Sequence, residues 1–317
     1  MENNNPILVS IHCLVYNHEP YIRQCLEGFI MQKTNFCFEA IVHDDASTDS
    51  SAAIIREYAE KYPHIIKPIY ETENQYSKKD GSLSRIMNAA CKGKYIAICE
   101  GDDYWTDPFK LQKQVDVLET YPDISFVYTA FNTVDDKGKL IKLKRSEDFI
   151  NRSHSGLIFF DLLVYCNFIM TLTTVFRKDI FINVTGHKYD WDYFLNASRM
   201  GKAYFIDERT CCYRINPKSV MNTCPQILKA PFYLTVLQEI DLVLSNKDGK
   251  TSEEIISHPY KNTVIGYIIA RYIRKSTCRR KFLKLLFKYP HMLFYTLKGL
   301  FIRLTCDNKF RNKVSKF

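Results

Sequence analysis

The chain lacks the marks of several protein classes. No uninterrupted apolar stretch among its 317 residues reaches the roughly 20 residues that a membrane-spanning helix needs. The 11 cysteines form no Cys-x-x-Cys pair and no His/Cys cluster at ligand spacing, and their number is odd, so a zinc site and a disulfide framework are both disfavoured. The polar start, residues 1–6, has neither the basic residues nor the apolar core of a signal peptide. We therefore expect a cytoplasmic protein.

Basic residues are outnumbered by acidic ones in most of the chain. The formal net charge is +9, yet residues 271–317 alone hold 14 Lys and Arg against one acid. The first 270 residues carry 30 basic and 34 acidic residues, a net charge of −4. Because the basicity is local, we expect the C-terminal segment to contact an anionic surface, and we expect no nucleic-acid binding by the body of the chain.

What is present is the composition of an ordinary folded protein, with 46% apolar and 25% charged residues. Strand and helix patterns alternate through the first half with short connections, which predicts an α/β fold with a mostly parallel sheet and helices on its faces. Beyond Pro225 the pattern is helical, with no convincing strand. We expect strands at 7–15, 38–42, 65–70, 95–99, 125–131, 171–176 and 203–206. The expected helices include 21–30, 52–62, 83–91, one that opens at 107–108, and 191–200. Residues 145–155 are expected to form a mobile polar loop.

Two adjacent carboxylates, Asp102 and Asp103, follow the strand expected at 95–99. Acidic side chains on a tight turn at the carboxyl end of a buried strand suit a hard divalent cation that also holds phosphate oxygens. The alternative is that these acids only cap the next helix, but capping needs one short polar residue and Asp107 supplies it. The pair therefore predicts a site for Mg²⁺ or Mn²⁺ in an enzyme that handles a nucleotide diphosphate.

A second pair, Asp44 and Asp45, ends the second expected strand. A buried carboxylate there can accept the imide N–H of uracil or thymine through a charge-assisted hydrogen bond, which selects the base. A polar turn with a helix cap is the alternative, and for residues 47–49 we prefer it. Tyr16 and Asn17, directly after the first strand, are placed to flank a nucleotide by stacking and hydrogen bonding.

The order and spacing of these segments resemble one family. Residues 9–11 leading to 16–17, the run 44–49, the strand at 93–96 and the pair at 102–103 are together similar to the large family 2 of inverting glycosyltransferases, which have the GT-A fold. The similarity covers about residues 6–214 and leaves the last third unexplained. It implies a nucleotide-sugar-binding half at 1–105 and an acceptor-binding and catalytic-base half of the same GT-A domain at 106–224. Composition and charge, not the resemblance, predict a helical, basic C-terminal segment at 225–317 that could associate with a membrane.

The resemblance implies roles at the matching positions. Asp45 matches the residue that contacts the nucleobase, with Asp44 beside it. Asp102 matches the contact to ribose or metal, and Asp103 matches the metal ligand of the D-x-D-type motif. Arg214 ends the similar region, where a loop of the family often folds over the donor, so Arg214 is placed to contact the pyrophosphate.

The resemblance also points to a catalytic base. Residues 189–194, Tyr-Asp-Trp-Asp-Tyr-Phe, are similar to the family's Gly-Asp-Trp segment, in which the aspartate before the aromatic residue is the general base. This selects Asp190, with Asp192 as a near rival because Tyr189 departs from the family pattern. An aspartate with an ordinary pKa of about 3.9 is a weak base, so it must take the proton late, as the new bond forms. The alternative role of Asp190 is to cap the following helix, and both roles are compatible.

The basic C-terminal segment contains two amphipathic stretches that flank Pro290. Lys and Arg surround the apolar residues of the second stretch. This combination suits a helix that lies in the interface of an anionic membrane, and packing of the apolar side on the catalytic domain is an equal alternative. The apolar stripe consists of Leu293, Leu297, Leu300 and Leu304, with Phe294 and Phe301 alongside.

The metal-site pattern together with the family resemblance implies a metal-dependent inverting glycosyltransferase. Its donor is a nucleotide-diphosphate sugar, most simply UDP-linked, and its acceptor is a glycan or lipid-linked glycan in surface polysaccharide or lipopolysaccharide assembly. The Q-x-x-R-W signature of processive synthases is missing, which favours single addition. Two rivals are weaker. A sugar-nucleotide nucleotidyltransferase carries a Gly-rich loop with a basic residue where this chain has Asn17, His18 and Glu19; a non-enzymatic protein that binds anionic surfaces leaves the ordered acids unexplained.

Overall fold

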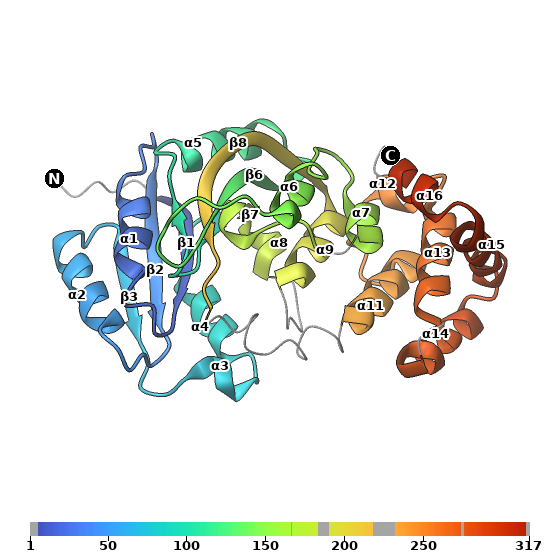
Figure 1. Ribbon diagram of the computed structural model, residues 1–317, viewed down its shortest axis with the longest axis horizontal. Coiled ribbons are helices and arrows are strands. Elements are labelled where there is room, and N and C mark those ends of the chain that lie inside the picture. Colours follow the sequence, from blue (N-terminus) through green and yellow to red (C-terminus); the bar gives the residue numbers. More distant parts are fainter. Residues whose placement is uncertain (1–5, 166, 183–189, 218–231, 274–275, 315–317) are drawn as a thin grey trace. The chain divides into compact units, whose positions relative to one another are not determined.

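The computed structural model describes residues 6–165, 167–182, 190–217, 232–273 and 276–314 (Figure 1). The chain divides into two compact units. Unit 1 consists of residues 1–153, 169–187 and 204–217, and unit 2 of residues 154–168, 188–203 and 218–317. No helix within the described ranges has the length and apolar character that crossing a bilayer requires.

Among the described residues, eight strands form one sheet in the order β3-β2-β1-β4-β7-β6-β8-β5. The first four are parallel, since β1 pairs in parallel with β2 and β4, and β2 pairs in parallel with β3. Antiparallel pairing begins at β7, which pairs with β4 and β6, and β5 pairs antiparallel with β8. The strands are β1 (Ile7–Val15), β2 (Cys37–Asp44), β3 (Ile66–Tyr70), β4 (Tyr95–Ile98), β5 (Tyr104–Trp105), β6 (Ile124–Val134), β7 (Val175–Arg177) and β8 (Lys202–Arg214).

The order of the parallel strands places a switch point at β1. The chain runs outward from β1 through β2 to β3 and then returns to form β4 on the other side of β1. The strand order therefore reverses at β1, and open α/β sheets bind their ligands at the carboxyl ends of strands that flank such a point. The central strands bury their side chains on both faces, as parallel strands covered by helices do.

The helices of unit 1 lie between these strands along the chain. Helix α1 buries Cys25, Leu26 and Phe29 at helical spacing. At Gly28 a Cβ atom would lie only 2.9 Å from the backbone nitrogen of Trp105, so the absence of a side chain lets α1 approach β5. The helices are α1 (Ile22–Ile30), α2 (Ser51–Lys61), α3 (Gln75–Lys78), α4 (Ser82–Ala90), α5 (Lys110–Thr120), α6 (Lys144–Ile150) and α8 (Lys178–Ile182), with the 3₁₀ turn η1 (Thr171–Thr173).

The described part of unit 2 is mainly helical. Its buried cation, Arg199 on α9, donates to Glu239 Oε2 on α11 at 2.8 Å and to Asp248 Oδ2 at 2.8 Å. These bonds connect α9 to the helices that follow it in sequence. The helices are α7 (Phe159–Tyr165), α9 (Asp190–Met200), α11 (Phe232–Ser245), α12 (Glu253–Ile256), α13 (Lys261–Ile273), α14 (Ser276–Lys288), α15 (Met292–Thr305) and α16 (Asp307–Val314).

The α/β class, the mostly parallel sheet with flanking helices and the helical C-terminal region are confirmed. Three local expectations are wrong. The segment 145–155 begins as helix α6, which buries Ser146 and Phe149 although the segment is polar overall. The strand expected at 171–176 starts as a 3₁₀ turn, in which Thr173 and Thr174 hydroxyls donate to carbonyls three residues back. The strand expected at 203–206 continues to residue 214 as β8.

The expected domain boundaries after residues 105 and 224 stay predictions.

Candidate active site

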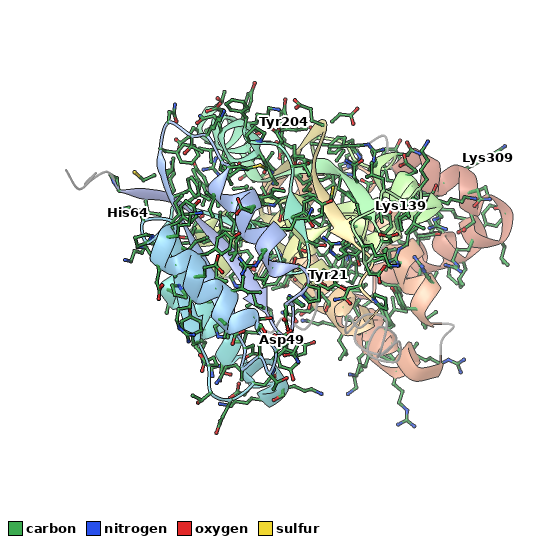
Figure 2. The ribbon with its side chains drawn as sticks, turned by 60° about the vertical axis from the view of Figure 1, so that its left-hand side comes forward. Tyr21, Asp49, His64, Lys139, Tyr204 and Lys309 are labelled. Atoms are coloured by element: carbon green, nitrogen blue, oxygen red, sulfur yellow. The ribbon has the colours of Figure 1, made fainter. Side chains whose placement is uncertain are left out.

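The loops after β1, β2 and β4 meet at the carboxyl edge of the parallel strands in unit 1. The backbone N–H of Asp45 donates to Val15 O at 2.9 Å, and that of Gly101 donates to Leu14 O at 3.0 Å. Both neighbouring loops therefore extend alongside the end of β1. In Figure 2 the labelled Asp49 belongs to this edge, whereas His64, which precedes β3, lies toward the other end of the strands.

Asn17 connects the first two loops. Its backbone adopts a φ of 56°, in the left-handed region that asparagine tolerates better than most residues. Its backbone N–H donates to Ser47 Oγ at 2.9 Å, and its Oδ1 accepts from the backbone of Thr48 at 2.8 Å. Ser47 and Thr48 thus act as turn residues. The neighbouring Tyr16 is exposed at this edge, and the nucleotide contacts expected of Tyr16 and Asn17 stay predictions.

Asp45 is buried and both of its carboxylate oxygens accept hydrogen bonds from the chain. Oδ1 accepts from the backbone N–H of Gln75 at 2.6 Å and Oδ2 from that of Tyr76 at 3.0 Å. These two amides belong to the first turn of α3, where the orphan N–H groups of a helix need acceptors. Asp45 therefore fixes α3 against the edge of the sheet, and its expected contact with a nucleobase stays a prediction.

Asp44 is buried but keeps an open acceptor. Its Oδ2 accepts from the backbone N–H of Ser47 at 3.2 Å, whereas its buried Oδ1 has no hydrogen-bond partner among the described residues. A buried carboxylate oxygen without a donor costs free energy, so such atoms mark places where a ligand supplies the missing hydrogen bond. Of the two aspartates, Asp44 therefore has the carboxylate better suited to accept an N–H from a bound base.

The acidic turn, residues 100–103, follows β4 and is closed by a hydrogen bond from the N–H of Asp103 to Glu100 O at 3.0 Å. The side chain of Asp103 is buried, and its Oδ1 accepts from the backbone N–H of Arg214 at 2.7 Å. The side chain of Asp102 retains 16% of its exposure. Its Oδ2 accepts from Asn216 Nδ2 at 3.0 Å. The turn thus presents one carboxylate toward solvent and holds the other against the end of β8.

Arg214 ties the acidic turn to its surroundings. The residue is buried, and its Nε donates to the carbonyl oxygen of Asp102 at 2.8 Å while Nη2 donates to Gln24 Oε1 on α1 at 2.6 Å. Nη1 donates to the carbonyl oxygens of Asp135 and Asp136 after β6, each at 3.3 Å, and the guanidinium carbon lies 4.7 Å from the ring centroid of Tyr21. The guanidinium therefore fastens α1 and the segment after β6 to the turn. Its expected contact with a pyrophosphate stays a prediction.

The charges of the acidic turn repel one another. Burial raises the pKa of Asp103 well above its ordinary value, and the negative charges of Asp102 and Glu100 raise it further. The hydrogen bond and the charge of Arg214 oppose this rise but do not cancel it. A cation placed beside the turn would relieve the repulsion, because it favours the ionised form of each neighbouring carboxyl group.

His18 stands beside the carboxylate of Asp102. Its Nε2 lies 3.9 Å from Asp102 Oδ2, and burial lowers the pKa of His18 despite the nearby negative charge. Its Nδ1 faces Gly101, where a Cβ atom would come within 2.8 Å of the ring nitrogen. A side chain at residue 101 would therefore displace the imidazole, so the glycine is needed for His18 to lie beside the acidic turn.

The donor set fits a divalent ion that is bound together with a diphosphate. Within the described ranges, no cluster of three or more His, Cys, Asp or Glu side chains is arranged to hold a metal by itself. Asp102 offers a solvent-reachable oxygen and the turn carries excess negative charge. Mg²⁺ and similar ions are often held by one or two carboxylates, with water and substrate phosphates completing the shell. The roles of Asp102 and Asp103 as metal ligands stay predictions.

Asp190 and Asp192 lie in the first turn of α9, in unit 2. Asp190 is exposed and Asp192 is buried, as expected for residues two apart on a helix, which face different directions. Asp190 reaches the surface, but surrounding protein atoms remove part of the water that would hydrate its carboxylate. This desolvation, and to a smaller extent the negative charge of Asp192, raise the pKa of Asp190 to about 6. Tyr189, whose departure from the family pattern makes Asp192 a rival, lies outside the described residues.

Sequence patterns do not predict two residues of this site, His18 and Asn216. Asn216 follows the end of β8 and belongs to no pattern, and only the fold brings it to Asp102. His18 attracts attention in the sequence only because it occupies the place of a basic phosphate loop. Its position directly after the first strand would have been enough to predict that His18 lies at the same edge of the sheet as the acidic residues.

Comparison with known structures defines the class of the fold. TarS of Staphylococcus aureus, in its complex with UDP-GlcNAc, superposes with a TM-score of 0.58 at 16% identity, covering 85% of this chain and 74% of that chain. The mannosyltransferase PcManGT of Pyrobaculum calidifontis, in complex with GDP-Man and Mn²⁺, superposes with a TM-score of 0.52 at 16% identity, covering 96% and 88%. The fold is that of the GT-A glycosyltransferases.

The sequence comparison then gives the family. The model of Glycosyl transferase family 2 matches residues 10–184, more than half of the chain, and the chain belongs to this family. An uncharacterized protein of Mycobacterium tuberculosis, Rv1520, is 36% identical over 211 residues, which are 65% of this chain. The aligned region spans 58% of the length of that relative.

Proposed function

We propose that this protein transfers a single sugar, with inversion, from a nucleotide-diphosphate sugar to an acceptor hydroxyl. Membership of the family gives the reaction class. The observation that carries the donor assignment is the acidic turn at the switch point of the sheet, with the Asp102 side chain partly exposed and Asp103 held by the backbone of Arg214. Sugar nucleotides in the complexes of TarS and PcManGT support a donor of this kind.

The donor is proposed to be UDP-linked. Asp44 Oδ1 is a buried acceptor without a partner among the described residues, and the imide N–H of uracil is a donor that it can satisfy. Tyr16 offers an exposed aromatic ring beside this edge, and a planar base can stack on it. Asp45 supports the arrangement by holding α3 in place.

Asp102 and Asp103 are proposed to hold Mg²⁺ or Mn²⁺, and the Mn²⁺ in the PcManGT complex supports this. When bound, the ion supplies charge neutralisation for the diphosphate as it leaves. Asn216 orients the carboxylate of Asp102 through its Nδ2, and Arg214 fixes the backbone of the same residue. These two residues therefore hold the open carboxylate in one direction before any ligand arrives, so less ordering is needed on binding.

Asp190 is proposed as the general base. In a single displacement, the acceptor oxygen forms a bond to the anomeric carbon, the bond from that carbon to the diphosphate oxygen breaks, and the proton of the acceptor passes to Asp190. Attack opposite the leaving group inverts the anomeric centre. A pKa of about 6 makes Asp190 a stronger base than an ordinary aspartate while leaving it ionised at neutral pH.

The acceptor is proposed to be a glycan or lipid-linked glycan of the cell surface, extended by one sugar per binding event. The missing Q-x-x-R-W signature supports single addition.

The test is a thermal-shift screen of purified protein against UDP-, GDP- and dTDP-sugars, with and without Mn²⁺. We expect UDP-sugars to raise the melting temperature only when Mn²⁺ is present. The variant Asp102→Asn should lose this response, whereas Asp116→Asn on α5, away from the strand ends, should keep it. Equal shifts without the metal, or a preference for another base, would overturn the donor assignment.

A further inference from the structure

Helix α15 in unit 2 presents a row of large apolar side chains to solvent. At 100° per residue, the five positions fall within about 100° of the helix circumference, so they form one continuous face. Their exposed fractions run from 53% to 73%, and apolar side chains gathered in one exposed patch mark interaction sites, whereas single exposed apolar residues do not. We call this the outer face of α15; it consists of Leu293, Phe294, Leu297, Phe301 and Leu304.

The opposite side of α15 is fixed by close packing on α13. At Gly266 a Cβ atom would lie 2.3 Å from the carbonyl oxygen of Tyr295, and at Gly299 it would lie 2.6 Å from the Cα of Tyr267. The two backbones therefore touch where both helices carry glycine. Met292 and Ile302 are buried on the same side. Because α15 cannot rotate without breaking this contact, the outer face stays directed away from α13.

Basic side chains are exposed on α15 and on the helices that precede and follow it. Lys298 is exposed on α15 itself, and Lys309, labelled in Figure 2, is exposed on α16. On α14 the ring of Phe287 is 83% exposed, with the exposed Lys284 one turn before it. Residues 271–317 as a whole hold 14 Lys and Arg against one acid.

This charge decides between the two simplest occupants of the face. A second copy of the chain would bring an equally basic segment against this one, and like charges at an interface oppose association. An anionic bilayer offers apolar depth for leucine and phenylalanine and negative headgroups for the lysines. We propose that the outer face of α15 inserts into the interface of an anionic lipid membrane, with α15 parallel to the membrane plane. This proposal goes beyond the enzymatic one and does not depend on it.

The test is co-sedimentation of the full chain with vesicles. We expect binding to phosphatidylcholine vesicles that contain about 30% phosphatidylglycerol, little binding to pure phosphatidylcholine, and weaker binding at high salt. The variant Phe301→Glu should bind at least about tenfold more weakly, because a charge replaces the ring that enters the membrane. Leu140→Glu is the matched control, since Leu140 in unit 1 has the same exposed fraction, 65%, as Phe301.

Several results would overturn the proposal. One is undiminished vesicle binding by Phe301→Glu, which would mean that the charges act without insertion. Another is a concentration-dependent dimer that Phe301→Glu abolishes, which would assign the face to a second copy. Absence of vesicle binding by the unmodified chain at low salt would also reject it. Because Phe301 is exposed, circular dichroism should show an unchanged fold in the variant, so that a loss of binding reports on the face itself.

Discussion

At the scale of single residues, the fold buries carboxylates at the acidic edge, where their negative charge is costly. Asp103 is buried beside two other acids, and its pKa is raised well above the ordinary value of 3.8. A group of this kind costs stability when it is ionised, and sites that bind charged ligands commonly accept such costs. Asp44, whose buried Oδ1 has no hydrogen-bond partner in the described part of the chain, is a second example at the same edge.

Asp103→Asn is expected to stabilise the metal-free protein. An amide oxygen can still accept from the N–H of Arg214, while the repelling charge is removed. The folded-state pKa of Asp103 lies above its unfolded value, so the folded protein loses stability as pH rises from about 4 toward that pKa, and the variant escapes this loss. Thermal unfolding in EDTA should show a gain of about 1 kcal/mol or more at neutral pH that shrinks toward pH 4. A destabilised variant would show that Asp103 is not strained.

Asp190→Asn is expected to abolish transfer and to leave nucleotide binding intact, because only the proton acceptor is lost. In the unmodified enzyme, kcat/KM should rise with pH through about 6 as Asp190 of the free enzyme loses its proton, and should level off above it. Steady-state assays between pH 5 and 8 measure both effects. Turnover that survives in Asp190→Asn but disappears in Asp192→Asn would move the base to Asp192.

The sequence was sufficient to identify the acidic residues of the site but not the residues that form hydrogen bonds with them. Asp44, Asp45, Asp102 and Asp103 are visible because each pair follows an apolar run. That Asp45 serves the amides of α3 depends on a four-residue helix whose sequence carries no apolar period. Contacts of this kind, between residues 30 or more apart, are set by the path of the whole chain.

At the scale of elements, β8 positions the acidic turn. Its last residue, Arg214, supplies both the N–H that holds Asp103 and the guanidinium that holds the backbone of Asp102. The sequence showed only the first few residues of this strand, since its middle, residues 207–209, is exposed and charged and interrupts the apolar pattern. The strands β1, β2 and β4 were predictable because these parallel strands are mostly buried and their residues are largely apolar.

Arg214→Lys is expected to lower the free energy of unfolding by about 2–4 kcal/mol and to weaken Mn²⁺-dependent nucleotide binding, because lysine cannot reproduce the fork that reaches Gln24 and the carbonyls. Arg209→Lys, on the same strand but partly exposed, is the control and should cost less than about 1 kcal/mol. Denaturant titration compares the two. Equal costs would mean that the buried contacts of Arg214 stabilise the fold no more than those of a partly exposed arginine, which would contradict its proposed role.

Gly266→Ala tests the crossing of α13 and α15. Alanine normally stabilises a helix relative to glycine, but here its Cβ would meet the backbone of Tyr295 at 2.3–2.4 Å. We expect a loss of about 2 kcal/mol or more, with Lys298→Ala as a neutral control on the exposed side of α15. A rise in melting temperature for Gly266→Ala would show that the helices do not approach this closely.

At the scale of the whole molecule, the acidic edge and the basic segment with its exposed apolar face belong to different units. Unit 1 carries the parallel strands and the acidic edge, and the C-terminal helices of unit 2 carry the basic residues and the exposed apolar face. The uneven charge was evident from the sequence alone. Whether the apolar stripe of α15 faced inward or outward was not, because α15 is apolar on both sides and only the glycine contact with α13 selects which side is buried.

The most direct test of the central claim is isothermal titration of the protein with UDP in the presence and absence of Mn²⁺, repeated for Asp102→Asn. The claim is that carboxylates at the switch point of the sheet bind a diphosphate through a shared divalent ion. We predict binding that requires Mn²⁺, a loss of at least about tenfold in affinity for Asp102→Asn, and no change for Asp116→Asn. Metal-independent binding of UDP that survives in Asp102→Asn would contradict the account.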